Sequence, residues 1–135
     1  IAGNGGSATM ASHFANDLKK NVHMTAQSLT DNMATITSIA NDISYKEIFT
    51  KQLASIAGEE DILLTISGSG NSENVVSISE IQKGIGIPLI SLTGFNGGKL
   101  GKIADININV PSNDYGIIEP IHDFLCHLIV KELSR

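Results

Sequence analysis

The chain of 135 residues carries 9 Lys and Arg against 14 Asp and Glu, and its formal net charge is −5 at pH 7. With 41% hydrophobic and 17% charged residues, the composition is that of a globular domain, which at this length can bury roughly two-thirds of its unfolded surface. Binding to duplex nucleic acid needs clustered Lys and Arg, and this acidic chain has no such cluster. A membrane span needs about 20 apolar residues, and the apolar runs here are far shorter. Neither nucleic acid nor a membrane is therefore expected as a partner.

Two helices are predicted in the first part of the chain. The first runs from Ser7 to about Lys20, and the second, with apolar residues at helical spacing, runs from Tyr45 to Ala57. The polar stretch 21–32 between them shows little pattern, and we expect at most a short strand at Ala26–Leu29. Asn41-Asp42 precedes the second helix and is placed either to cap it or, beside a cleft, to hold a sugar hydroxyl.

Three apolar runs in the rest of the chain predict parallel strands, at Ile62–Ile66, Ile87–Leu92 and Ile106–Val110. The last run alternates strictly with polar residues, which is typical of an edge strand with one face in water. Helices are predicted at Glu73–Lys83 and Pro120–Leu133. Strands that alternate with helices at this spacing predict a doubly wound, Rossmann-like α/β fold, a parallel sheet with helices on both faces.

Two turns rich in glycine and serine, at the ends of predicted strands, favour a phosphate monoester as ligand. In Gly3–Ser7 the backbone amides, the helix N-terminus and the Ser7 hydroxyl can bind an anion or cap the helix. Ser67–Ser72 offers three hydroxyls and two glycines at the next strand end. Taken alone, either segment could also be an ordinary turn that binds no ligand, because glycine and serine are common in turns. The first turn lacks the Gly-Lys-Ser/Thr ending of a Walker loop and the GxGxxG pattern of dinucleotide-binding turns, so no nucleotide cofactor is expected.

Acidic and histidine side chains recur on two of the predicted helices. His13 and Asp17 are four residues apart, so they share a helix face and suit a metal or an acid–base pair, although a surface ion pair has the same spacing. On the last helix, Glu119 and His127 are eight residues apart and can border one cleft. We expect His122 to be a core residue instead.

The only cysteine, Cys126, excludes an internal disulfide and a thiolate metal site, which favours a reducing compartment and hence the cytoplasm. Its apolar neighbours on a helix predict a buried and inert thiol. No secretory signal is visible at the start of the sequence. Because the sequence begins at Ile1 without an initiator Met, we expect that upstream residues of the domain are missing.

In order and spacing, these motifs resemble the sugar isomerase (SIS) domain family, in particular its phosphoheptose isomerase branch. Besides the two turns, the resemblance rests on His13-Phe14-Ala15, Ala40-Asn41-Asp42, Leu92-Thr93-Gly94 and Ile121-His122 to His127. It implies one SIS domain over residues 1–135 without its N-terminal helical segment. It also implies an isomerase that converts sedoheptulose 7-phosphate to D-glycero-D-manno-heptose 7-phosphate for bacterial surface glycans, and a homotetramer with sites at its subunit interfaces.

The resemblance also implies roles for individual residues. It assigns the acid–base pair to Asp17 and His127. A bound zinc ion would be held by His13, Asp17, Glu119 and His127. Substrate and phosphate binding are assigned to Asn4, Ser7, Asp42, Ser67, Gly68, Ser69, Ser72 and Glu119.

Three of these positions depart from the family pattern. Asp17 stands where relatives carry Glu, Glu119 where they carry Gln, and Gly68 where they often carry Thr. A further departure is Asn21, where many relatives carry an Arg that helps to hold the substrate. The added carboxylate at position 119 repels a sugar phosphate unless a divalent metal or a proton offsets it. The alternative is a non-catalytic SIS module, acting as a sugar-phosphate sensor or as an adaptor of the replication-initiator-associating kind.

Overall fold

Four parallel strands form one sheet in the order β1-β2-β3-β4. The computed structural model describes residues 1–135, and its strands are β1 (Ala2–Gly3), β2 (Leu63–Ser67), β3 (Leu89–Thr93) and β4 (Ile106–Asn109). Every residue of β2 is buried, whereas β4 at the edge is partly exposed. The predicted strands and the doubly wound fold class are confirmed.

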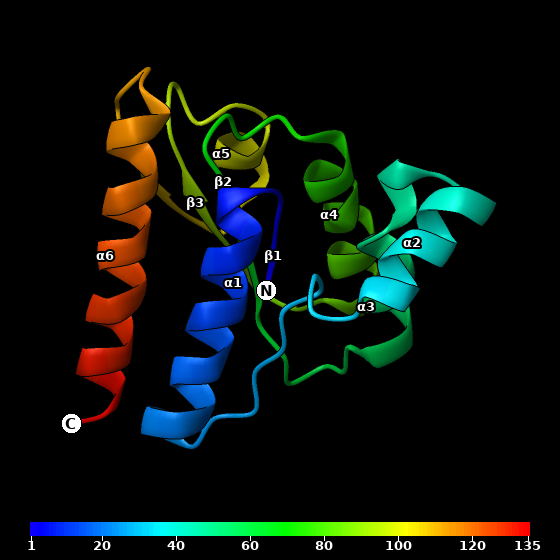
Figure 1. Cartoon of the computed structure of the whole chain (residues 1–135), viewed down its shortest axis with the longest axis horizontal. Helices are drawn as coiled ribbons and strands as arrows, with labels where there is room; N and C mark the ends of the chain where they lie inside the picture. The colour runs from blue at the N-terminus through cyan, green and yellow to red at the C-terminus, as the bar shows by residue number, and fades with distance from the viewer.

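Helices cover both faces of this sheet. In Figure 1, α1 and α6 lie side by side over one face, and α2, α3 and α4 lie on the other. No helix is both long enough and apolar enough to cross a membrane. The helices are α1 (Gly6–Asp17), continued by the π-helical turn η1 (Leu18–Val22), α2 (Met33–Asp42), the 3₁₀ turn η2 (Tyr45–Glu47), α3 (Thr50–Ile56), α4 (Glu73–Ile85), α5 (Leu100–Ile103) and α6 (Tyr115–Leu133).

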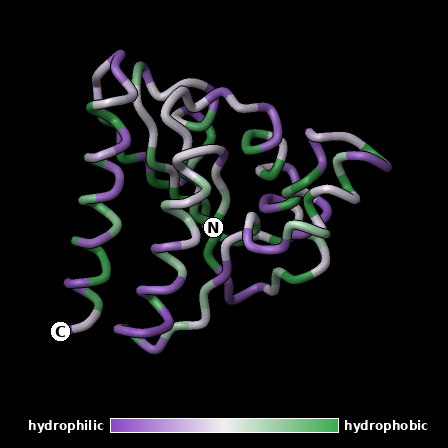
Figure 2. Tube along the Cα trace, viewed as in Figure 1, coloured by the Kyte–Doolittle hydropathy of each residue, from purple (hydrophilic) through white to green (hydrophobic).

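The two faces of the sheet bury separate hydrophobic cores, because neighbouring residues of a strand point to opposite faces. Leu63 packs with Phe49 beneath α3 and α4, whereas Leu64 and Ile66 pack with residues of α1 and α6. Cys126 is buried in this second core, where loss of solvation raises the pKa of its thiol to about 12. The expectation of a buried thiol is therefore confirmed. Figure 2 shows α6 alternating between hydrophobic and hydrophilic segments, as a helix with one packed face must.

The region before α3 differs from the prediction. The strand expected at Ala26–Leu29 does not form, although the Leu29 amide donates a hydrogen bond to the Ile1 carbonyl at 2.9 Å. The helix α2 was not predicted, although Ile36, Ile39 and Ala40 lie at helical spacing and pack against one core. These residues are only partly buried, so the packed face of α2 is small. Of the two roles open to Asn41-Asp42, capping of the following helix is wrong, because Asp42 is the last residue of α2 and Ser44 is the N-cap of the next turn.

The helix α6 begins at Tyr115, before the predicted start at Pro120. The Asp114 side chain caps it by accepting a hydrogen bond from the Gly116 amide at 2.8 Å. Pro120 therefore lies inside the helix, near its start. The early start matters for the site, because it adds Tyr115 to the end of α6 that faces the two predicted turns.

A buried histidine of α6 gives the fold a dependence on pH. His122 is fully buried, as predicted, with Nε2 3.0 Å from the Thr93 carbonyl oxygen and no partner for Nδ1. Burial lowers its pKa from 6.5, against the opposing effects of the Thr93 carbonyl and the Glu119 charge. Below about pH 6.5 the unfolded chain binds a proton here that the folded state resists binding, so acidification destabilises the fold.

Replacing His122 by Gln should flatten this dependence, because Gln keeps an N–H donor for Thr93 but does not titrate. We expect the wild-type free energy of unfolding to fall by on the order of 1 kcal/mol more than that of the variant between pH 7.5 and 5.5. Urea unfolding at several pH values measures the difference. Equal losses in the two proteins would contradict the assignment to His122.

Candidate functional site

The two predicted turns meet in one pocket at the carboxyl ends of β1 and β2, where ligands bind in open parallel sheets. The pocket has a volume of about 240 Å³. Its lining is mostly polar or glycine and comes from three places in the sequence. The residues are Asn4, Gly5, Gly6, Ser7, Ile66, Ser67, Gly68, Ser69, Ser72, Tyr115 and Glu119.

Serine hydroxyls in this pocket are free to bind a ligand. Those of Ser7, Ser67 and Ser72 make no hydrogen bond within the protein, while that of Ser69 accepts one from the Asn71 amide at 3.2 Å. The capping role that the sequence allowed for Ser7 is wrong. Gly5 is the N-cap of α1, and Ser7 lies inside the first turn. The N-termini of α1 and α4 add amide donors and partial positive charge, which suits a phosphate, and the pocket is therefore named the phosphate pocket.

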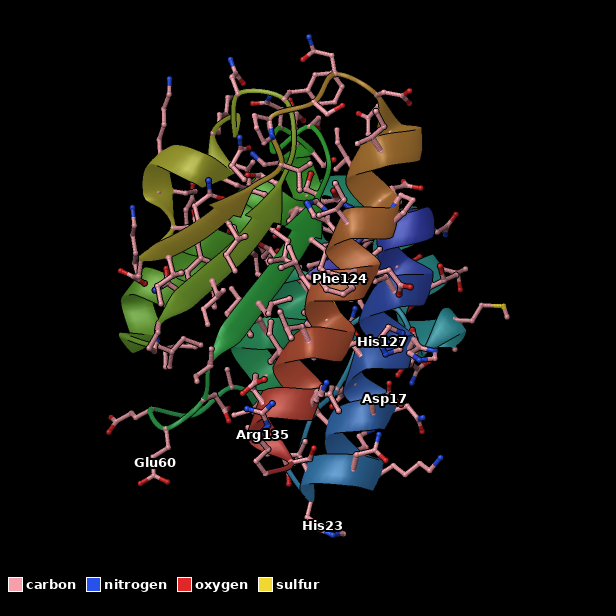
Figure 3. The ribbon with its side chains drawn as sticks, turned by 90° about the vertical axis from the view of Figure 1, so that its left-hand side faces the viewer. Asp17, His23, Glu60, Phe124, His127 and Arg135 are labelled. Carbon is pink, nitrogen blue, oxygen red and sulfur yellow. The ribbon has the colours of Figure 1, made fainter.

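A carboxylate and two imidazoles converge between α1 and α6. The Asp17 Oδ2 atom lies 3.2 Å from His13 Nε2 and 3.6 Å from His127 Nδ1. Figure 3 shows Asp17 and His127 approaching each other from the two helices. The Asp17 side chain is only 16% exposed, whereas both histidines are more than half exposed and open to a ligand. On its other side, His127 Nε2 lies 3.8 Å from the Asp123 carboxylate.

The same three side chains have the chemistry of a zinc site. One donor atom from each of His13, Asp17 and His127 lies within 4.8 Å of the others. Two imidazole nitrogens and one carboxylate oxygen are ligands that zinc accepts, and three protein ligands leave a position for substrate. Glu119, the fourth ligand implied by the resemblance, is not part of this group. Its carboxylate instead lies against Gly6, at the edge of the phosphate pocket.

A groove leads from the phosphate pocket to His13, the one member of this cluster that lines it. It runs along α1 and α6, and His13 and Asp123 line it. Gly6, Tyr115 and Glu119 line both the groove and the phosphate pocket. A molecule held by a phosphate at one end can therefore extend past Glu119 toward the imidazoles.

Comparison with known proteins identifies the family. The model of the SIS domain matches residues 1–94. A phosphoheptose isomerase of Helicobacter pylori (strain P12) is 38% identical over 140 residues, which cover 100% of this chain and 73% of the relative. The chain belongs to the SIS domain family, among the phosphoheptose isomerases.

Solved structures of phosphoheptose isomerases share the architecture of this SIS domain. That of Francisella tularensis superposes with a TM-score of 0.93 at 36% identity, over 98% of this chain and 73% of its own. That of Neisseria gonorrhoeae gives a TM-score of 0.91 at 33% identity, over 98% of this chain and 74% of its own.

The resemblance also assigns Asn4 and Asp42 to the substrate site of this SIS domain, but their side chains are hydrogen-bonded within the protein, unlike the free serine hydroxyls. The Asn4 amide is paired reciprocally with Asn74 of α4, at 2.8 and 2.9 Å, and accepts a third bond from Tyr45. The side chain of Asn4 therefore holds the first turn against α4 while lining the pocket. Asp42 is exposed on α2, bonded to Asn41, and lines none of the pockets described above.

Sequence reasoning missed Tyr115, which lines the phosphate pocket, the groove and a third depression beside Ser69 in this SIS domain. The available signal was the Asp114 side chain, which is a strong helix N-cap directly before an aromatic residue. A helix that starts at Pro120 would exclude Tyr115.

Proposed function

We propose that this SIS domain converts sedoheptulose 7-phosphate to D-glycero-D-manno-heptose 7-phosphate. The observation that carries the proposal is the approach of the Asp17 carboxylate to His127 and to His13, since His13 lines a groove that is continuous with the serine-lined pocket. The proposal is supported by the named activity of the relatives, which match the whole chain. A carboxylate and an imidazole are the usual acid and base of proton transfer.

Phosphate binding fixes the substrate without a lysine. The hydroxyls of Ser67, Ser69 and Ser72 and the amides at the N-termini of α1 and α4 surround the phosphate. Because the phosphate does not react, its binding energy serves to place the carbonyl end of the sugar in the groove. The Glu119 carboxylate at the boundary is within reach of the sugar hydroxyls. Because it also repels the phosphate, its charge has to be offset by a proton or a cation when the substrate is bound.

Isomerisation then requires only proton transfers. One of Asp17 and His127 removes a proton from C1 of the ketose as the carbonyl oxygen on C2 gains one, which forms an enediol. The other group gives a proton to the C2 oxygen and then takes one from the C1 oxygen. The first group returns its proton to C2, and the carbonyl moves to C1. No net proton is gained or lost, so the pair returns to its starting state.

Zinc is included in the proposal, with His13, Asp17 and His127 as its ligands. Bound there, it would polarise the carbonyl oxygen and stabilise the negative charge of the enediolate. A metal bound there would occupy lone pairs of both Asp17 and His127 and make each a weaker base, so the ligand and proton-transfer roles of this pair compete. The proposal also includes a cytoplasmic location, which rests on the single cysteine of the chain, and a homotetramer, which rests on the family resemblance alone.

The test is an isomerase assay with sedoheptulose 7-phosphate, run on protein stripped of metal and again after zinc is added. We expect turnover, and we expect zinc to increase it by about tenfold or more, because carbonyl polarisation lowers the barrier by several kcal/mol. Binding of the heptose phosphate without turnover in either sample would support the non-catalytic sensor and overturn the enzyme.

A further inference from the structure

Tyr115 occupies a central place in the candidate site. It is the single residue that lines the phosphate pocket, the groove toward His13 and the third depression, which Phe95 also lines. The groove and the phosphate pocket meet at Gly6, Tyr115 and Glu119. Any molecule that spans from the serines to the imidazoles must pass the ring of Tyr115.

Gly68 creates the space that the ring occupies. A Cβ atom at Gly68 would lie 2.6 Å from Cε1 and 2.9 Å from Cδ1 of Tyr115, closer than carbon atoms can approach. The backbone of Gly68 is not in the left-handed region, so space, not backbone strain, limits this position. A glycine at this place in the phosphate-binding turn therefore allows an aromatic ring to lie directly against the turn.

A second aromatic residue supports the ring. Phe95 packs edge-on against Tyr115, with centroids 5.3 Å apart and an angle of 63° between the planes. Phe95 has a φ of 49°, a conformation that costs a bulky residue about 1–3 kcal/mol and is found mainly at functional sites. The Tyr115 hydroxyl makes no hydrogen bond within the protein, and the residue is 49% exposed. The ring is thus held in place while much of its surface stays open to a ligand.

We propose that Tyr115 is a specificity-determining residue, whose ring packs against the carbon chain of the bound sugar phosphate between its phosphate and its reacting carbons. This inference rests on the proposed function for the identity of the ligand. The C–H groups of a sugar pack well on an aromatic face. Inorganic phosphate, which fills only the serine-lined end, gains little from that contact.

The experiment measures the affinities of the wild type and of two variants, Tyr115→Ala and Tyr115→Phe, for sedoheptulose 7-phosphate and for inorganic phosphate. We expect Tyr115→Ala to weaken binding of the sugar phosphate by about five- to tenfold and binding of phosphate by less than about twofold. Tyr115→Phe keeps the ring and should bind both ligands like the wild type. Equal weakening for both ligands, or equal losses in the two variants, would overturn the packing role.

Gly68→Ala tests the same contact from the opposite side. The added methyl should displace the ring and weaken sugar-phosphate binding to a similar extent, with no further loss when it is combined with Tyr115→Ala. Additive losses would overturn the link between the two residues. Ile117→Ala, a truncation of a half-exposed neighbour on α6 that lines none of these pockets, is the matched control and should change nothing.

These outcomes separate the inference from the proposed function. Wild-type protein that binds sedoheptulose 7-phosphate without turning it over would end the proposed isomerase activity, while the affinities of the variants would still decide the role of Tyr115. Turnover by the wild type, with unchanged sugar-phosphate affinity in Tyr115→Ala, would end the inference alone.

Discussion

Replacing Asp17 by Asn is expected to lower the turnover of sedoheptulose 7-phosphate by about 10²- to 10⁴-fold, because the amide cannot accept a proton. The change preserves the size of a side chain that is only 16% exposed and faces His13 and His127. Affinity for inorganic phosphate should stay within about twofold, since the serine-lined pocket does not include position 17. Steady-state kinetics and phosphate binding give the two measurements.

Replacing His127 by Ala should produce the same pattern, because it removes the other member of the pair. Two control substitutions remove similar groups outside the site. Glu80→Gln removes one exposed carboxylate of α4. His23→Asn removes an exposed imidazole at the far end of η1 from the Asp17 cluster, where a φ of 59° suits Asn.

Both controls should retain wild-type kinetics. If either active-site variant lost phosphate affinity in step with turnover, Asp17 and His127 would act in binding or folding, not in proton transfer. If Asp17→Asn lost zinc as well as activity, and excess zinc restored turnover, its main role would be that of a ligand. Residual activity near the wild-type level in both variants would remove this pair from the mechanism.

The fold could be predicted because its central strands, β2 and β3, are buried on both faces. Every residue of β2 and all but one of β3 are buried, and most of them are apolar, with only Ser or Thr among them, which is the pattern of a parallel sheet covered by helices. The strict alternation at 106–110 likewise identified the edge strand. By contrast, α2 buries no residue fully, and its periodic signal is limited to Ile36, Ile39 and Ala40, which are partly buried against one core. The Asn32 cap adds one more signal, and together these are weaker than the patterns of the buried strands.

The site could be predicted where the chemistry is local in sequence. Each glycine–serine turn is a continuous segment, and His13 and Asp17 lie on one helix face, so spacing alone placed them. The approach of His127 to Asp17 depends on how α1 and α6 pack, which no local pattern encodes. Glu119 shows the same limit, because helix geometry placed it beside the cleft but could not say that it would face Gly6 instead of the imidazoles.

Replacing Gly70 by Ala should disable the phosphate-binding turn. Gly70 has a φ of +65°, and a Cβ there would meet the backbone carbonyl of Gly97, which cannot move aside as a side chain can. The Gly70 carbonyl also accepts a hydrogen bond from the Leu100 amide at 3.0 Å, so the turn is fastened to the segment that leads into α5. Left-handed strain and the backbone clash together should lower the free energy of unfolding by about 2–5 kcal/mol.

Gly70→Ala should also weaken phosphate binding, because Ser69 and Ser72 flank Gly70 and would be displaced with it. We expect affinity for inorganic phosphate to fall by at least about tenfold, since one lost charge-assisted hydrogen bond costs about 1.5–3 kcal/mol. Urea unfolding and calorimetric titration, at a temperature where the variant is folded, measure the two effects. Gly84→Ala is the matched control, because Gly84 lies inside α4 with no atom near its Cβ position, and Ala should stabilise that helix by about 0.5–1 kcal/mol. A Gly70→Ala protein as stable as the wild type, with unchanged phosphate affinity, would show that the contact between the turn and Gly97 does not shape the pocket.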